Sequence, residues 1–120
     1  MSDSKKGGTI PRLRDAKTSE NVCGLIEAML QDDKAEDVTV LDLIGKTSIA
    51  DHMIIASGRS ARHVTAIADH IIDRLKEAGV DNVSVEGRQQ ADWILLDVGD
   101  VIVHLFRPEI RAFYNLEKMW

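Results

Sequence analysis

The sequence predicts a single α/β domain, in which helices flank a small mixed β-sheet. Apolar residues at helical spacing alternate along the chain with short segments that are rich in β-branched residues. A helical segment connects two predicted strands, which favours parallel strands, whereas a very short turn makes the last two strands antiparallel. The expected order of elements is α-β-β-α-β-β-β-α, and 120 residues suffice for one domain with its own core.

The first half of the chain contains one predicted helix and two predicted strands. The helix begins at Ser19 and has a single apolar stripe: Val22, Leu25, Ile26, Met29 and Leu30. Residues 36–43 alternate and are rich in β-branched side chains, which is typical of a strand. A turn at 44–46 leads to a second strand at 51–57, which Gly58 ends.

The clearest amphipathic helix follows Ser60, a residue type that caps helix N-termini. Its apolar stripe consists of Val64, Ile67, Ala68, Ile71, Ile72 and Leu75. Gly79 suits the position just after a helix, and Arg74 and Lys76 suit the negative end of the helix dipole. A short strand is expected at 83–87.

The C-terminal part predicts a hairpin and a final helix. Strands at 93–98 and 101–106 are joined by a turn that contains Gly99. Pro108 suits the first turn of the final helix. That helix has a short apolar stripe of Ile110, Phe113 and Tyr114.

The net charge of −5 is unevenly distributed. Residues 1–17 carry five basic and two acidic side chains, and residues 18–120 carry 10 basic and 18 acidic ones, so the two parts have charges of +3 and −8. We expect a flexible basic tail at 1–17 and one folded domain at 18–120. An acidic domain repels free nucleic acid and attracts basic partners, although the same charge could simply serve solubility.

A single cysteine, Cys23, excludes an internal disulfide and favours a reducing compartment. Because it lies within the first helical stripe, we expect a buried and inert thiol. No apolar run approaches the ~20 residues that span a bilayer, and the N-terminal residues lack the apolar segment of a secretory signal. A cytoplasmic location is expected.

Motifs for catalysis and metal binding are weak. No two acidic residues are separated by two positions, the spacing that would place two carboxylates on one strand face for two-metal chemistry. Asp51 and Asp97 could still converge from separate strands. The turn Gly58-Arg59-Ser60 lacks the pattern of a phosphate-binding loop, although a lone anion at the helix start is an alternative. One cysteine and four scattered histidines do not predict zinc. We expect no catalytic residue, metal or cofactor.

Strand alternation places Trp93, Leu95 and Asp97 on one face of the predicted hairpin, and Ile94 and Leu96 on the other. The second pair suits a core. A large aromatic side chain beside an acid suits the docking of a partner that carries Lys or Arg, because Trp is a frequent interface anchor. Burial of Trp93 under a helix is the alternative, and composition does not distinguish the two.

His104 lies among apolar residues in the second strand of the hairpin. A hydrogen bond with Asp97 or Asp100 could make it a partly buried residue that orders the turn. The alternative is that His104 shapes or joins the docking surface.

The chain contains three characteristic segments in this order: SIADHMIIASGRSARHVTAIADHI, ADWILLDVGDVIVHLF and the ending RAFYNLEKMW. Together they closely resemble the ribosomal silencing factor family, RsfS, also called the Iojap family, over about residues 19–120. The resemblance implies a nucleotidyltransferase-like α/β fold without a recognised catalytic site. It also implies binding to a ribosomal protein (large-subunit protein fourteen) on the subunit-joining face of the large ribosomal subunit. Small-subunit joining would thereby be blocked sterically, and translation would fall when nutrients are short.

On this basis we expect Trp93 and Leu95 to be the apolar anchors of the interface. Their expected neighbours are Asp92, Asp97, Asp100, Val101, Asp51, His52 and Met53. One alternative is a large-subunit biogenesis factor that uses the same surface, and a less favoured one is a metal-dependent nucleotidyltransferase. Neither membrane contact nor binding of free nucleic acid is expected, and an exposed apolar face could let the free protein form a homodimer.

Overall fold

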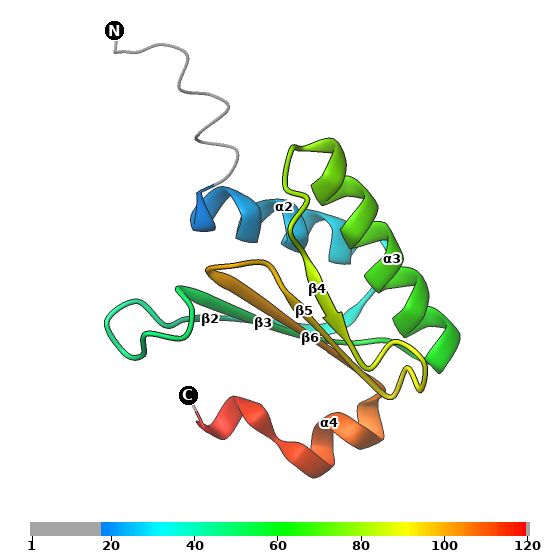
Figure 1. Ribbon diagram of the computed structural model, residues 1–120. Coiled ribbons are helices and arrows are strands. Elements are labelled where there is room, and N and C mark those ends of the chain that lie inside the picture. The colour runs from blue at the N-terminus through cyan, green and yellow to red at the C-terminus, as the bar shows by residue number, and fades with distance from the viewer. Residues whose placement is uncertain (1–17, 120) are drawn as a thin grey trace, which may run out of the picture.

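The computed structural model describes residues 18–119 (Figure 1). The helices are α2 (Ser19–Asp32), α3 (Ala61–Glu77), α4 (Pro108–Tyr114) and the 3-10 helix η1 (Leu116–Met119). The strands are β2 (Glu36–Asp42), β3 (His52–Ser57), β4 (Ser84–Glu86), β5 (Trp93–Asp97) and β6 (Val101–Phe106). The predicted order is confirmed, and η1 is the one additional element within residues 18–119. The tail predicted at 1–17 lies outside the described residues.

The five strands form one mixed sheet in the order β2-β3-β6-β5-β4. β3 and β6 are parallel neighbours, and the remaining neighbours are antiparallel. Two antiparallel pairings separate β4 from β6, so β4 runs in the same direction as β3, as predicted for the strands on either side of α3. The two strands are not adjacent, because β6 and β5 lie between them.

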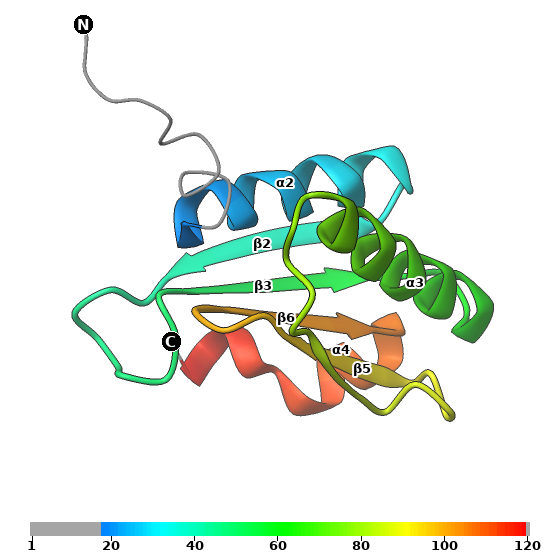
Figure 2. The ribbon, with the colours of Figure 1, turned by 45° about the horizontal axis from the view of Figure 1, so that its top comes forward.

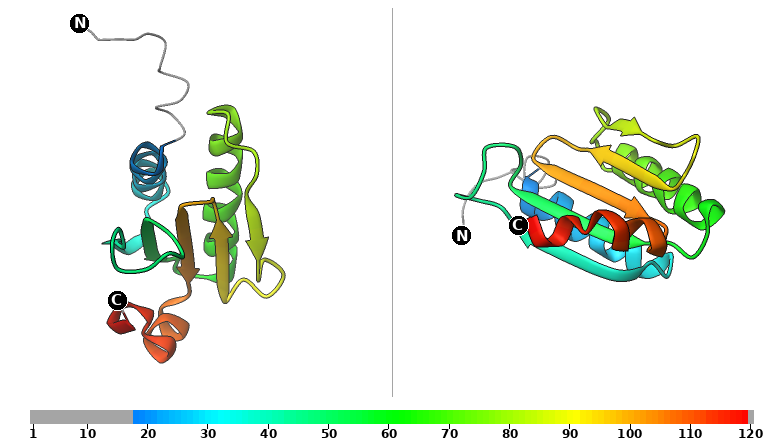
Figure 3. Two further views of the ribbon diagram at one scale, coloured as in Figure 1. Left: turned by 60° about the vertical axis from the view of Figure 1, so that its left-hand side comes forward. Right: turned by 90° about the horizontal axis from the view of Figure 1, so that it is seen from below.

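Helices cover the two faces of the sheet unequally (Figures 2 and 3). α2 and α3 lie on one face and enclose the main core. The helices contribute Ile26, Leu30, Ile67, Ile71 and Leu75 to it, and the strands contribute Ile54, Ile94, Leu96, Val103 and Leu105. All ten side chains are fully buried, and each such burial contributes roughly 1.5–3 kcal/mol.

The start of α3 is held by local hydrogen bonds. Ser60 Oγ accepts from the backbone N–H of His63 at 3.1 Å, which confirms the predicted cap. His63 Nδ1 accepts from the backbone N–H of Arg59 at 2.9 Å, and its Nε2 lies 2.8 Å from the carbonyl oxygen of Asp33. The His63 ring therefore joins the start of α3 to the end of α2. At the other end of α3, Gly79 adopts a φ of 89°, as its predicted position requires.

Cys23 is 5% exposed within the main core, so its predicted burial is confirmed. Burial, and secondly the negative charge of Glu27, raise the pKa of its thiol above the usual range. The thiolate, which is the reactive form, is therefore disfavoured.

α4 lies on the opposite face and closes a smaller core around Leu43, Met53, Ile55 and Phe106. Partly buried side chains pack against these four: Leu41, Trp93, Ile110 and Leu116. In the view from below, α4 passes over β3 and β6 and leaves β5 and β4 uncovered (Figure 3). The second face of the sheet is therefore only half covered by the described part of the chain.

Arg111 attaches α4 to the edge of the sheet. Its Nη1 donates to the carbonyl oxygen of Asp37 at 2.6 Å and to Ser57 Oγ at 3.0 Å, and its Nη2 donates to Thr39 Oγ1 at 3.1 Å. Asp37 lies at the irregularity in β2 and has a φ of 51°. One guanidinium thus links the last helix to both β2 and β3.

The apolar stripe predicted on α4 does not pack as a unit. Ile110 is partly buried against Phe106 and its neighbours, whereas Phe113 is 80% exposed and Tyr114 is 50% exposed. Ile110 packs toward the smaller core, whereas the ring of Phe113 lies against Tyr114, and Tyr114 lies against Trp93 at the margin of this core. No other described element lies beyond α4 to cover them.

His104 is a buried polar residue on this second face, only 6% exposed. Trp93 Nε1 donates a hydrogen bond to its Nδ1 at 2.9 Å. The bond considered with Asp97 or Asp100 is not formed, because the register places His104 opposite Leu95 and away from the turn. Burial lowers the pKa of the His104 imidazole to about 4.

We predict that Gly87→Ala destabilises the fold far more than Gly99→Ala. Both glycines have positive φ, 83° and 74°, which costs an alanine ~1–2 kcal/mol. Around Gly99 a Cβ meets nothing within 4 Å, whereas at Gly87 it would overlap the backbone carbonyl of Trp93. Urea denaturation should give a loss of about 1 kcal/mol for Gly99→Ala and more than about 3 kcal/mol for Gly87→Ala. Equal losses would contradict the close approach of β4 and β5.

We also predict acid sensitivity from His104. Its folded pKa of about 4 lies below the ordinary value of 6.5, so between these pH values the unfolded chain binds a proton that the folded chain does not. Stability is therefore complete above pH 6.5 and falls as the pH drops toward 4, by on the order of 3 kcal/mol. The variant His104→Gln keeps an acceptor for Trp93 but does not titrate. The difference in unfolding free energy between wild type and this variant should change across that window, and a constant difference would refute the assignment.

Candidate functional site

Trp93 is the first residue of β5 and stands in an aromatic stack. Its ring centroid lies 4.8 Å from that of Phe106 and 4.7 Å from that of Tyr114. The hydrogen bond from its Nε1 to His104 fixes the rotation of the indole. Trp93 remains only half-buried. The alternative of burial under a helix therefore holds only in part, because α4 covers one side of the indole and leaves the other side open. Docking through Trp93 stays a prediction.

Next to Trp93 the uncovered half of the face continues along β5. Leu95 is half-buried and Asp97 is exposed, and both share the face of Trp93. An open depression of about 320 Å³ is lined by Glu86, Gly87, Trp93 and Leu95. It is a shallow, mainly apolar hollow with a carboxylate at its margin. Such a hollow suits a side chain of a protein partner better than an enclosed small molecule.

The aromatic residues of α4 extend this surface. Phe113 and Tyr114 meet edge to face at 5.1 Å between ring centroids, and Tyr114 in turn stacks on Trp93. We call Trp93, Leu95, Phe113 and Tyr114 the aromatic surface. Sequence reasoning missed the two α4 residues as candidates for docking. The available signal was the adjacency of two large aromatic residues on a short final helix, although periodicity alone does not show which of them is exposed.

The other predicted site residues do not all join this surface. Asp92 forms an ion pair with Arg107, with 3.2 Å between Oδ1 and Nε. Asp97 accepts a hydrogen bond from the backbone N–H of Gly99 at 3.1 Å and so also orders its own turn. Val101 is 1% exposed and Met53 is 5% exposed, so both belong to the cores and present almost no surface.

Asp51, His52 and Asp100 form a separate group where β3 and β6 begin. The backbone N–H groups of Asp51 and His52 both donate to the carbonyl oxygen of Asp100, at 2.8 and 3.1 Å. Ser19 Oγ donates to Asp51 Oδ2 at 2.9 Å. This group lies at the opposite end of β6 from Phe106, the residue that pairs with Trp93.

A loop beside the depression is held by an ion pair. Arg88 donates from Nε and Nη2 to the two carboxylate oxygens of Asp69 on α3, at 2.9 and 2.7 Å. The hydrogen bonds from Arg88 lower the pKa of Asp69 below its usual range. The pair is solvent-exposed, so it positions the loop at 87–92 more than it stabilises the fold.

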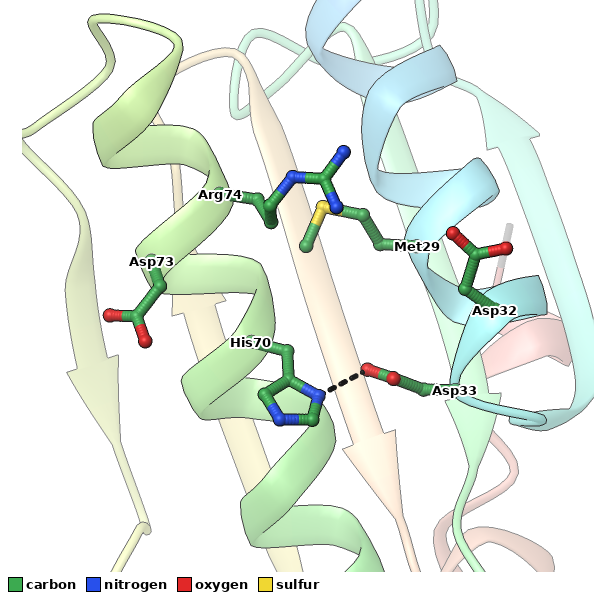
Figure 4. Close-up of a pocket in the computed structure, with 6 residues that line it drawn as sticks. All are labelled: Met29, Asp32, Asp33, His70, Asp73 and Arg74. Carbon is green, nitrogen blue, oxygen red and sulfur yellow. Dashed lines mark hydrogen bonds and ion pairs between the residues drawn. The ribbon is translucent and has the colours of Figure 1, made fainter.

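A second hollow, of about 230 Å³, lies between α2 and α3 (Figure 4). His70 points across it to Asp33, with 2.9 Å between Nδ1 and Oδ2, while Arg74 and Met29 approach each other and Asp73 points away. Across residues 18–119, no three His, Cys, Asp or Glu side chains are arranged to hold a metal ion. The His70–Asp33 pair has no Ser or Cys nucleophile beside it in this hollow, and it serves as a link between two helices.

No helix in the described part of the chain combines the length and apolarity needed to span a bilayer.

Comparisons with known proteins point to one family. The family described as "Ribosomal silencing factor during starvation" matches residues 16–120 of this chain. A protein of Zymomonas mobilis named ribosomal silencing factor RsfS is 54% identical over 101 residues, which cover 84% of this chain and 76% of that protein. A mouse protein named mitochondrial assembly of ribosomal large subunit protein 1 is 30% identical over 99 residues, covering 80% of this chain and 43% of that protein.

The fold agrees with these sequence matches. A crystal structure of protein CV0518 from Chromobacterium violaceum superimposes with a TM-score of 0.83 at 40% identity, covering 86% of each chain. An α/β domain of this topology, matched over nearly its whole length by one family, leaves one conclusion. The chain belongs to the ribosomal silencing factor family.

Proposed function

We propose that this protein docks on the large ribosomal subunit through its aromatic surface and sterically prevents the small subunit from joining. The partner we propose is a basic ribosomal protein on the joining face, large-subunit protein fourteen. The observation that carries the proposal is an exposed aromatic surface, centred on a fixed tryptophan, on an acidic domain of the silencing-factor family.

Trp93 has the properties of an interface anchor. Its indole is held on three sides, by His104, Phe106 and Tyr114, so little side-chain freedom is lost when a partner covers the fourth side. Leu95 and the depression next to it offer a place for an apolar side chain of the partner. An anchor of this kind accounts for more affinity than the rim around it.

Charge supports a basic partner. Residues 18–120 carry a net charge of −8, and the exposed carboxylates of Asp97 and Glu86 lie on the same face as the aromatic surface. Complementary charge accelerates and orients docking more than it tightens the complex. Asp92 contributes less to this attraction, because Arg107 already neutralises part of its charge.

The proposed contact residues follow from exposure. Trp93, Leu95, Phe113 and Tyr114 form the centre, and Asp97 and Asp92 belong to the rim. Asp51, His52 and Asp100 are at most peripheral, at the far end of β6. Val101 and Met53 support the face from within the cores.

The mechanism is occlusion, which needs no covalent step, catalytic residue or cofactor. Two bodies cannot occupy one surface, so a silencing factor seated on the joining face of the large subunit excludes the small subunit. The protein would act in the cytoplasm, where translation takes place.

A role in large-subunit biogenesis is the second candidate. It is favoured by the name of the mouse relative, which refers to assembly of the mitochondrial ribosomal large subunit. The same surface would be used, but at a different stage. Sucrose-gradient fractionation separates the two roles: a biogenesis factor accumulates on precursor particles, and a silencing factor accumulates on mature free large subunits.

Subunit joining, followed by light scattering, tests the proposal directly. Large subunits preincubated with this protein should join small subunits less, in a dose-dependent manner that saturates near one protein per large subunit. An undiminished signal, with the protein shown to be folded by circular dichroism, would rule out direct silencing.

Substitutions on the aromatic surface should weaken docking without unfolding the protein. We expect Trp93→Ala to weaken large-subunit binding by about 30- to 1,000-fold, as loss of ~2–4 kcal/mol at an anchor implies. Phe113→Ala, at a side chain that is 80% exposed, should leave the unfolding free energy unchanged and weaken binding about tenfold. Ile49→Ala is the matched control, since Ile49 is 61% exposed but lies between β2 and β3. If all three variants bound equally well by sedimentation with large subunits, the aromatic surface would not be the interface.

A further inference from the structure

A third hollow, separate from the aromatic surface, lies where the start of α2, the end of α3 and the turn between β5 and β6 meet. It encloses about 480 Å³ and contains four valines, Val22, Val80, Val98 and Val101, which form an apolar floor. Asp81 and Asp100 belong to its lining, and none of the lining residues in the described part of the chain is basic. The C-terminal end of α3 also borders this hollow, at Gly79, and contributes the negative end of a helix dipole.

We call this third hollow the groove. The chain enters the domain at its edge. Ser19, the first residue of α2, is one of the lining residues. Its Oγ is bonded to Asp51, whose backbone N–H is bonded to Asp100. The blue start of α2 lies close to the orange turn between β5 and β6 (Figure 1), and Ser19, Gly99 and Asp100 line the same hollow. The point from which the N-terminal residues extend is therefore held beside the groove.

The residues that precede this point match the groove in chemistry. Residues 1–17 carry a net charge of +3, and they include the run Ile10-Pro11-Arg12-Leu13-Arg14. In an extended chain, side chains at 12 and 14 point one way and the side chain at 13 points the other. A residue that precedes proline, as Ile10 does, favours an extended backbone. A short extended segment of this kind presents two guanidinium groups beside one apolar side chain.

Residues 12–14 are covalently attached to the domain close to the groove, so even a weak contact would be sufficient to hold them there. Leu13 is six residues from Ser19, so an extended chain reaches ~20 Å at most, and closing so short a loop costs little entropy. Attachment through a short linker gives an effective concentration in the millimolar range. A segment attached in this way would occupy the groove even if its intrinsic affinity were low.

We propose that the N-terminal segment docks in this groove of its own domain, with Leu13 on the valine floor and Arg12 and Arg14 paired with Asp81 and Asp100. The family match begins only at residue 16, so this contact is a property of this chain and independent of the proposed silencing activity. It neutralises part of the acidic surface at one end of the sheet.

Nuclear magnetic resonance on the full chain tests the proposal without the ribosome. With methyl-labelled Leu and Val, we expect nuclear Overhauser effects between the methyl groups of Leu13 and those of Val80 or Val98. The double variant Arg12→Gln/Arg14→Gln should lose them and shift the amide signals of Gly79, Asn82 and Gly99. The double variant Lys5→Gln/Lys6→Gln removes the same charge outside the proposed contact and should keep both the Overhauser effects and the shifts.

The reciprocal change, Asp81→Asn/Asp100→Asn, should release the segment to the same extent. Absence of the Overhauser effects in the wild-type chain, with the groove amides insensitive to both pairs of basic substitutions, would overturn the proposal. So would Overhauser effects that arise only between differently labelled molecules, because the segment would then occupy the groove of a second copy.

Discussion

β6 is the strand on which both faces of the sheet depend. It pairs in parallel with β3 on one side and antiparallel with β5 on the other, so it connects the two halves of the fold. Strand alternation sends Val103 and Leu105 into the core under α2 and α3, and sends His104 and Phe106 toward α4. Because every one of these four side chains is buried, the register of β6 determines where Trp93 stands. A shift of one residue would exchange the two faces.

The unequal cover of the two faces explains why one of them is available to a partner. Two helices of 14 and 17 residues lie on the first face, whereas a helix of seven residues covers only half of the second. Trp93 and His104 lie at the boundary between the covered and the open part of the sheet, and the indole Nε1 of Trp93 donates to Nδ1 of His104. Burial of a neutral histidine thus provides the acceptor that an indole N–H needs when it faces away from water.

Much of this arrangement can be predicted from the sequence, because it rests on local rules. The cap at Ser60, the left-handed Gly79 and the separation of Trp93 from Ile94 follow from neighbouring residues alone. Pairing between distant segments decides the rest. It places β6 between β3 and β5, and it makes Trp93, and not Asp97, the hydrogen-bond partner of His104. The exposure of Phe113 likewise depends on which elements pack around α4, and residue periodicity does not encode that arrangement.

The hydrogen bonds from Arg111 to β2 also affect the exposed edge of the sheet. β2 is an outermost strand of seven residues, and unpaired edge strands can template pairing between molecules. At Asp37 the strand is kinked by a left-handed residue, and the carbonyl there is already occupied by the guanidinium. A foreign strand approaching this edge would meet an interrupted ladder in place of a regular row of donors and acceptors. Arg111, which attaches α4 to the sheet, therefore also disfavours edge-to-edge aggregation of the protein.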